Sequence, residues 1–176
     1  MAKDKFMVII VGNGTSILDK KNGEVIDSFN DVVRFNSFRI KDYEEYTGSK
    51  TTVWFTCNSH HIKEINLFKE VYVHTWQWDK QKCELFKSFQ SHRTDCIKTD
   101  REFVRSNIPL SAPSTGLIAI YIMLEKYSNV TITGFDWWDR EDHHYADKQI
   151  RGTLHKPKEE YKLIKKFIDC GKVKFL

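Results

Sequence analysis

A short apolar run at residues 6–11 ends in a Gly-Asn-Gly turn at 12–14, and this junction narrows the possible folds more than any other part of the chain. A strand that runs into a glycine turn and a helix start presents backbone N–H groups to an anion, usually a phosphate. A second apolar run at 31–35 ends at Asn36, where a dinucleotide-binding fold would carry an acidic residue. The two runs together therefore predict an α/β fold that binds a nucleotide other than NAD.

The rest of the chain continues the alternation of strands and helices. Further short apolar runs lie at 52–56, 71–74, 130–133 and 173–176. Residues 115–127 are nearly all apolar behind a capping Ser114, which predicts a buried helix, and Pro157 suits the first turn of an amphipathic helix. We expect a single Rossmann-like α/β domain with a mainly parallel sheet flanked by helices.

In such a fold ligands sit beyond the carboxyl ends of the strands, and the notable polar residues collect at those predicted ends. They are Gly12, Asn13, Asn36, Asn58, Gly134 and Asp136. The stretch 75–110 is polar, carries Trp76 and Trp78, and is interpreted as a lid or insertion beside the site.

Composition bounds the remaining possibilities. The 176 residues, with a formal net charge of +4, predict one domain over 1–176 that accepts an anionic ligand without requiring nucleic acid. The first apolar run is too short for a signal peptide, and no segment approaches the eighteen or so apolar residues that span a bilayer. The four cysteines are widely spaced, so free thiols in a reducing compartment are expected. We expect a cytoplasmic protein. The lysines near the C-terminus would also allow peripheral contact with a membrane surface.

Two other patterns favour neither triphosphate hydrolysis nor a metal site. The segment 48–52 has a Gly-Ser-Lys-Thr sequence, but it lacks the earlier glycine of a P-loop and precedes a strand. The histidine pairs at 60–61 and 143–144 are adjacent in sequence, and adjacent side chains on a strand point to opposite faces. No metal and no cofactor are therefore predicted. The sequence Asp142-His143-His144 still leaves a metal-dependent phosphoesterase as one alternative function.

His155 is the candidate general base. It lies just before the helix that begins near Pro157, and Glu159 and Glu160 follow. The positive end of a helix dipole disfavours a protonated imidazole, which suits a base near neutral pH, particularly if a carboxylate orients the ring. The alternative reading is a surface histidine beside two solvated glutamates.

These pieces occur together, and in the same order, in the sialyltransferase family. The large sialyl motif resembles residues 11–14, 23–36 and 48–52, and the small motif resembles Ala112-Pro113-Ser114-Thr115-Gly116 with 130–136. The third motif resembles His143-His144-Tyr145-Ala146-Asp147. The very short motif resembles His155 with Glu159 or Glu160. Together they cover about half of the chain. Eukaryotic members have a membrane anchor and a cysteine pair that links the large and small motifs. We expect neither here, because no apolar segment is long enough and neither motif core contains a cysteine. The chain's Gly-Asn-Gly-Thr-Ser turn is also similar to that of soluble bacterial sialyltransferases with a related fold.

The resemblance implies a variant GT-A-like fold and metal-independent, inverting transfer of a sugar acid from a CMP-activated donor to a glycan or glycolipid hydroxyl. It implies that Asn13 and Asn36 contact the phosphate and ribose of CMP, that His144 and Tyr145 bond the departing phosphate, and that His155 deprotonates the acceptor. The candidate nucleotide- and donor-binding residues are Gly12, Asn13, Gly14, Asn36, Ser114, Thr115, Gly116, Asp136 and Tyr145. The candidate catalytic residues are His155, His144, Glu159 and Glu160.

Several alternatives stay open at this point. The chain is short for the family, so a non-catalytic module that binds CMP is the second hypothesis. The donor acid could be sialic acid or Kdo, since both travel as CMP esters. The sequence leaves open the acceptor, the oligomeric state, and the choice within the pairs His143/His144 and Glu159/Glu160.

Overall fold

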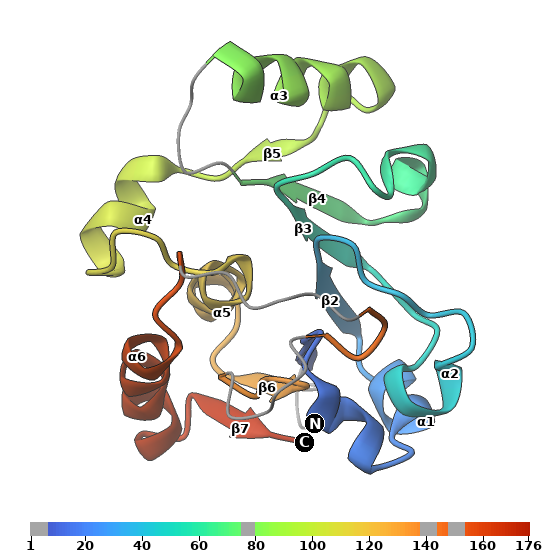
Figure 1. Cartoon of the computed structure of the whole chain (residues 1–176), viewed down its shortest axis with the longest axis vertical. Helices are drawn as coiled ribbons and strands as arrows, with labels where there is room; N and C mark the ends of the chain where they lie inside the picture. The colour runs from blue at the N-terminus through green and yellow to red at the C-terminus, as the bar shows by residue number, and fades with distance from the viewer. Residues whose placement is uncertain (1–6, 75–79, 138–143, 148–153) are drawn as a thin grey trace, which may run out of the picture.

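The computed structural model describes residues 7–74, 80–137, 144–147 and 154–176, and it has seven strands in one sheet (Figure 1). In chain order the elements are β1 (Val8–Val11), η1 (Thr15–Asp19), α1 (Gly23–Asp27), β2 (Asp31–Phe35), α2 (Glu44–Thr47), β3 (Val53–Thr56), η2 (Ile62–Leu67), β4 (Glu70–Val73), α3 (Lys80–His92), β5 (Ile97–Lys98), α4 (Arg101–Asn107), α5 (Thr115–Lys126), β6 (Val130–Thr133), α6 (Pro157–Asp169) and β7 (Val173–Phe175). The α/β class expected from the alternating runs is confirmed.

The strand order is β5-β4-β3-β2-β1-β6-β7, and every pairing between the described strands is parallel. From β1 the chain builds outward to β5, and then returns to place β6 on the other side of β1. This change of direction leaves a crevice beyond the carboxyl ends of β1 and β6, where ligands bind in open parallel sheets. The topology therefore locates a candidate site before any side chain is considered.

Strand residues alternate between the two faces of the sheet, and each face has its own helices (Figure 1). Ile10 and Ile132 pack in a core with helices α4, α5 and α6. Ile9 and Val11 point to the other face, where η1 and α1 cover them. At the far end of this second face, Trp54 packs under η2 and α3. The result is three layers, helix on sheet on helix, with α5 across the middle of the sheet.

The stretch interpreted as a lid or insertion has regular structure over its described part. Residues 80–110 form α3, β5 and α4, and β5 extends the sheet beside β4. Phe89 of α3 and Val104 of α4 are both buried in the cores. Residues 75–79, with Trp76 and Trp78, lie outside the described residues. The described part thus belongs to the sheet edge and its covering helices.

The segment 48–52 has a structural role. The guanidinium of Arg34 on β2 is fully buried and donates hydrogen bonds to the carbonyls of Thr47 and Gly48. The carboxylate of Asp27 accepts bonds from the backbone N–H groups of Ser49 and Lys50. Burial lowers the pKa of Arg34 to about 10, which leaves it charged at neutral pH. These bonds hold the segment as the connection into β3.

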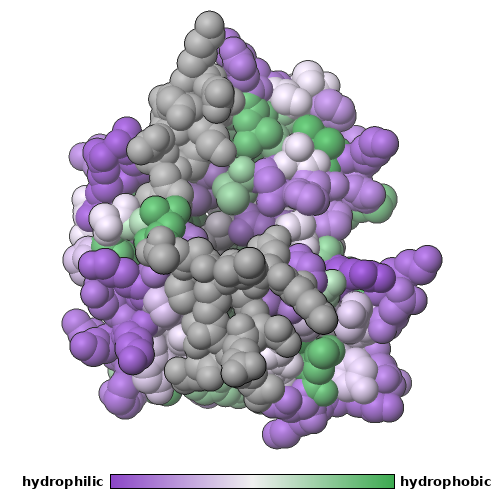
Figure 2. Space-filling model, viewed as in Figure 1, coloured by the Kyte–Doolittle hydropathy of each residue, from purple (hydrophilic) through white to green (hydrophobic). Residues whose placement is uncertain are grey.

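Outside the grey atoms, the surface seen in Figure 2 is mainly hydrophilic, with small, separate apolar areas. Large exposed apolar side chains include Leu67 and Leu154. Of the described cysteines, Cys57, Cys96 and Cys170 form no disulfide. Among the described residues no helix has the length and apolar character needed to cross a bilayer.

His74, at the end of β4, predicts a loss of stability in mild acid. Only 3% of the residue is exposed, and burial lowers its pKa to about 4. As pH falls below 6.5 the unfolded chain binds a proton at this position and the folded chain does not, so stability is lost between pH 6.5 and 4. At pH 5 this term amounts to about 2 kcal/mol. Urea unfolding of wild type and His74→Gln at pH 7 and pH 5 measures it, and equal losses in the two proteins would contradict the assignment.

Candidate active site

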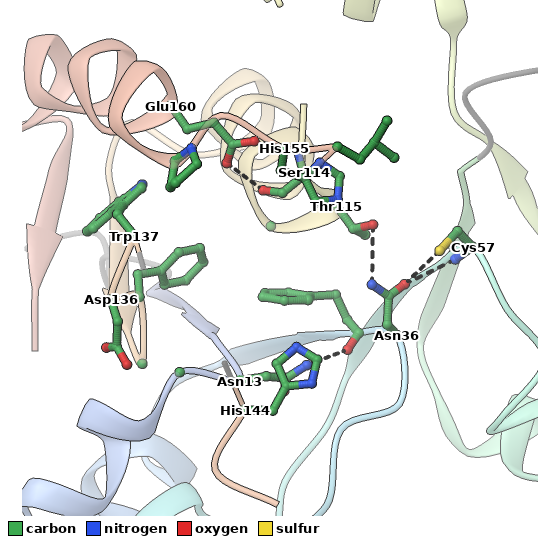
Figure 3. A pocket seen from close by; sticks show the side chains of 17 residues that line it. Asn13, Asn36, Cys57, Ser114, Thr115, Asp136, Trp137, His144, His155 and Glu160 are labelled. Carbon is green, nitrogen blue, oxygen red and sulfur yellow. Dashed lines mark hydrogen bonds between the residues drawn. The ribbon is translucent and has the colours of Figure 1, made fainter. Parts of the chain in front are cut away.

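A cavity of about 270 Å³ opens at the crevice between the ends of β1 and β6 (Figure 3). Its polar lining comes from the ends of β1, β2, β3 and β6, from the N-terminus of α5, and from the residues around the start of α6. The predicted site residues that line it are Asn13, Gly14, Asn36, Ser114, Thr115, Gly116, Asp136, His144, His155 and Glu160. The fold therefore gathers ten predicted residues that are spread over almost 150 positions of sequence.

The turns after β1 and β6 pack together so closely that only glycine fits. A Cβ on Gly12 would lie 2.1 Å from the carbonyl oxygen of Gly134, which itself has a φ of +68°. Gly12 thus lies beneath the cavity wall and shapes it without lining it. Asp136 reinforces the junction, because its Oδ2 accepts bonds from Ser16 N at 3.1 Å and Thr15 Oγ1 at 3.3 Å. This carboxylate holds the glycine turn in place.

Asn36 is held in a fixed orientation at the end of β2. Its backbone has a left-handed φ of 54°, and its carbonyl accepts a bond from the indole of Trp54. The side-chain Oδ1 accepts from Cys57 N at 3.2 Å, and Nδ2 donates to Thr115 Oγ1 at 3.4 Å (Figure 3). Since a primary amide has two N–H donors, one remains to face a ligand in the cavity.

Cys57 lines the cavity, although sequence analysis did not select it. Its Sγ lies 3.3 Å from Oδ1 of Asn36, and its backbone N–H also bonds that oxygen. The available signal was its place directly after the strand predicted at 52–56. Cys57 thereby determines which end of the Asn36 amide turns toward the cavity.

The N-terminus of α5 presents donors to the same cavity. Ser114 is the predicted N-cap, and its Oγ accepts the backbone N–H of Leu117 at 3.2 Å. A Cβ on Gly116 would lie 2.9 Å from the ring of Phe135 and 3.0 Å from that of Phe35. The glycine lets these two rings approach to 5.8 Å and close the cavity against the start of the helix. The positive end of the α5 dipole therefore faces an enclosed space, which suits an anion.

The structure distinguishes the two glutamates. Glu160 lines the cavity and accepts bonds from Ser114 N and Ser114 Oγ, both at 2.7 Å. Burial raises the pKa of its carboxyl group, and the bonds from Ser114 and the nearby His155 oppose that rise. Glu159 instead points to solvent and pairs with Lys156 at 3.5 Å. Glu160 joins the starts of α5 and α6, while Glu159 is outside the site.

His155 has a defined tautomer in this arrangement. Its Nδ1 lies 2.9 Å from the carbonyl oxygen of Ala112, which can only accept, so Nδ1 carries the hydrogen. In a neutral ring Nε2 is then the basic nitrogen. The sequence analysis considered a carboxylate that would orient this ring. In the structure the carbonyl of Ala112 bonds Nδ1, and the Glu160 carboxylate lies near enough to interact with the ring through its charge.

The third motif divides between the cavity and the core. His144 lines the cavity, and its Nδ1 lies 3.2 Å from Asp147 Oδ1. Tyr145, expected beside it as a phosphate ligand, is not part of the lining: it is 8% exposed, and its hydroxyl bonds the backbone of Arg39. His143 lies outside the described residues.

Two residues of the cavity lining have a left-handed backbone conformation. Asn36 and Trp137, with φ values of 54° and 43°, both line the cavity, and strain of this kind concentrates at functional sites. Within the described ranges, no three His, Cys, Asp or Glu side chains are grouped so that they could hold a metal ion.

Comparisons with known proteins agree with the geometry. A family model described as glycosyltransferase family 29 (sialyltransferase) matches residues 7–99, just over half of the chain. The human β-galactoside α-2,6-sialyltransferase 2 is 28% identical over an alignment of 159 positions, gaps included, that takes in 70% of this chain and 30% of that protein. The rat CMP-N-acetylneuraminate-β-galactosamide-α-2,3-sialyltransferase 4 is 23% identical over an alignment of 218 positions that takes in 96% of this chain and 63% of that protein.

Solved structures show the same fold. The crystal structure of a mammalian sialyltransferase superposes with a TM-score of 0.70 at 19% identity, covering 98% of this chain and 69% of that one. A complex of a mammalian sialyltransferase with Gal-β-1-3GalNAc-ortho-nitrophenol matches equally well. In sequence, the chain spans only 30% of the length of the α-2,6 relative and 63% of the length of the α-2,3 relative.

Proposed function

This chain belongs to glycosyltransferase family 29, the sialyltransferases, and we propose that it transfers a sialic acid from a CMP-activated donor to a hydroxyl group of a glycan. One observation carries the proposal. A single cavity brings the donor-rich start of α5 together with Asn36, His144 and the oriented imidazole of His155. An anionic leaving group needs hydrogen-bond donors and an acceptor hydroxyl needs a base, and transfer between them requires the two to lie side by side.

The anionic part of the donor fits the polar wall of the cavity. The backbone N–H groups at the start of α5 and the second N–H of Asn36 are donors that favour a phosphate or carboxylate. His144, whose Nδ1 faces Asp147, donates from Nε2 to such an anion when its ring is protonated. Asn13 and Gly14 line the neighbouring wall, where the nucleoside would lie. The donors are in place before the ligand arrives, so charge that develops on the departing phosphate is stabilised without reorganisation.

His155 serves as the general base. As the acceptor oxygen attacks the anomeric carbon, Nε2 takes its proton, and the bond from that carbon to the phosphate oxygen breaks with its electron pair leaving on CMP. The new bond forms on the face opposite the leaving group, so the configuration inverts. The imidazolium then lies near the Glu160 carboxylate, whose charge stabilises it. We expect the reaction to need no metal, because the polar wall itself receives the phosphate charge.

The proposal predicts that CMP stabilises the protein and that a CMP-activated donor is turned over. Because a ligand that binds only the folded state raises stability, CMP at a hundred times its Kd should raise the Tm by about 5–10 °C, with or without EDTA. CMP-sialic acid and CMP-Kdo are then incubated separately with the protein, with and without a β-galactoside acceptor of the kind the relatives' names give. Release of free CMP from CMP-sialic acid supports the proposal.

The other outcomes separate the alternatives. Turnover of CMP-Kdo alone would assign a different sugar acid to the same site. CMP binding without turnover of either donor would indicate a non-catalytic module. No Tm shift at millimolar CMP would refute the proposal altogether.

A further inference from the structure

We propose that Tyr145 is a positioning residue, and that it holds His144 in the cavity from outside the cavity. This inference rests on the proposed function only for the role of His144 as a phosphate contact. The four residues 144–147 contain one side chain that lines the site, His144, and one that is buried elsewhere, Tyr145. One peptide unit separates the two, so a constraint on the tyrosine limits where the imidazole can go.

Tyr145 is attached at three points. Its backbone N–H donates to the carbonyl of Asn13 at 2.9 Å. Its hydroxyl donates to the carbonyl of Arg39 and accepts from Arg39 N at 3.3 Å. Its ring packs in the core cluster that also holds Val11 of β1 and Ile17 of η1, and it lies edge-on to Tyr43 with centroids 5.0 Å apart.

These attachments leave the tyrosine no role as a ligand. Burial raises the pKa of the phenol, so the hydroxyl keeps its proton and donates it to Arg39. Both bonding partners of the hydroxyl are main-chain groups of the loop that follows β2. A phosphate in the cavity would have to displace bonds already made in the core, at the cost of unsatisfied buried groups.

The same attachments aim the histidine. The bond from Tyr145 N to Asn13 O joins this segment to a residue that lines the cavity, so the imidazole is placed relative to the Gly-Asn-Gly turn. Asp147, two residues after Tyr145, then sets the ring orientation through Nδ1 of His144. Ala146 packs against the same core cluster as the tyrosine. Tyr145 thus fixes the position of His144, and Asp147 fixes the orientation of its ring.

The test uses two tyrosine variants with a matched control. Tyr145→Phe removes only the hydroxyl bonds to Arg39, and Tyr145→Ala also removes the ring. Tyr127→Phe is the control, because it removes a hydroxyl bonded to Asp31 at the opposite end of β2. The affinity for CMP is measured by calorimetry below the Tm of every variant, together with His144→Ala and the double variant His144→Ala/Tyr145→Ala.

Positioning predicts a specific pattern of affinities. His144→Ala should weaken CMP binding at least roughly tenfold, since it removes a charge-assisted bond to phosphate. Tyr145→Ala should weaken binding to about the same extent, and Tyr145→Phe about threefold. The double variant should bind no more weakly than His144→Ala, and Tyr127→Phe should bind as wild type does. Wild-type affinity in both Tyr145 variants, or a further loss in the double variant, would overturn the inference.

A second readout separates this inference from the proposed function. The His144 imidazole signal in an NMR spectrum, assigned by its absence from His144→Ala, reports the position of the ring without any ligand. We expect the signal to move in both Tyr145 variants and to stay in Tyr127→Phe. If wild type binds no CMP, the proposed function fails, and the NMR result alone decides: an unmoved His144 signal overturns the positioning role.

Discussion

Replacing His155 by alanine is expected to slow sugar transfer about a thousandfold while CMP binds with nearly its wild-type affinity. A positioned general base contributes about two to four orders of magnitude in rate, and alanine has no group that could accept the proton. His155 lines the same cavity, and the α5 donors and His144 that would hold the phosphate are unchanged by the substitution. The measurement is the rate of product formation from CMP-sialic acid and a β-galactoside, with the Kd for CMP determined on the same preparation.

A matched control is available on α3. His92 is exposed near the end of that helix, its ring bonds Ser88, and it is not among the residues that line the cavity. His92→Ala should transfer as fast as wild type. Transfer by His155→Ala at a tenth of the wild-type rate or faster would remove this imidazole from the mechanism. An equal loss of CMP affinity and rate would make it a binding group instead.

The order of strands and helices was predictable because its signals are local. Apolar runs at 31–35 and 130–133 appear as β2 and β6, Ser114 caps α5, and Pro157 occupies the first turn of α6. Each of these depends on residues a few positions apart. The parallel class followed from the alternation of these elements, and with it the expectation that the strand ends hold the site.

The details of the site depend on contacts between distant segments, and these could not be read from local patterns. Glu159 and Glu160 are neighbours in sequence, yet only Glu160 meets Ser114, 46 residues earlier in the chain. Helical spacing offered a partial signal, since Glu160 lies four residues before the buried Ile164. Tyr145 was expected at the departing phosphate because the resemblance to the third sialyl motif implies it, and the ring is buried in the core instead. Cys57 was missed because its role is to orient another residue.

Gly12→Ala is expected to be the most damaging of the single-methyl substitutions at the glycines of the site. The added Cβ would lie 2.1 Å from the carbonyl oxygen of Gly134, which is backbone and cannot turn aside. Gly12 N also bonds Thr133 O at 2.7 Å, so relieving the clash would pull β1 from β6 where the cavity begins. Overpacking of this kind costs about 3 kcal/mol or more when the neighbour cannot move. Chemical denaturation and CMP calorimetry should show both stability and affinity falling.

The control for this prediction is Gly171→Ala, at a glycine whose backbone conformation is unusual but which has no close neighbour. Gly171 has a φ of +74° after α6, and a Cβ there would meet nothing within 4 Å. Its cost is therefore conformational only, about 1 kcal/mol, and CMP affinity should be unchanged. If Gly12→Ala lowers the free energy of unfolding no more than Gly171→Ala does, the turns after β1 and β6 are not in close contact. The shape of the cavity would then not depend on that contact.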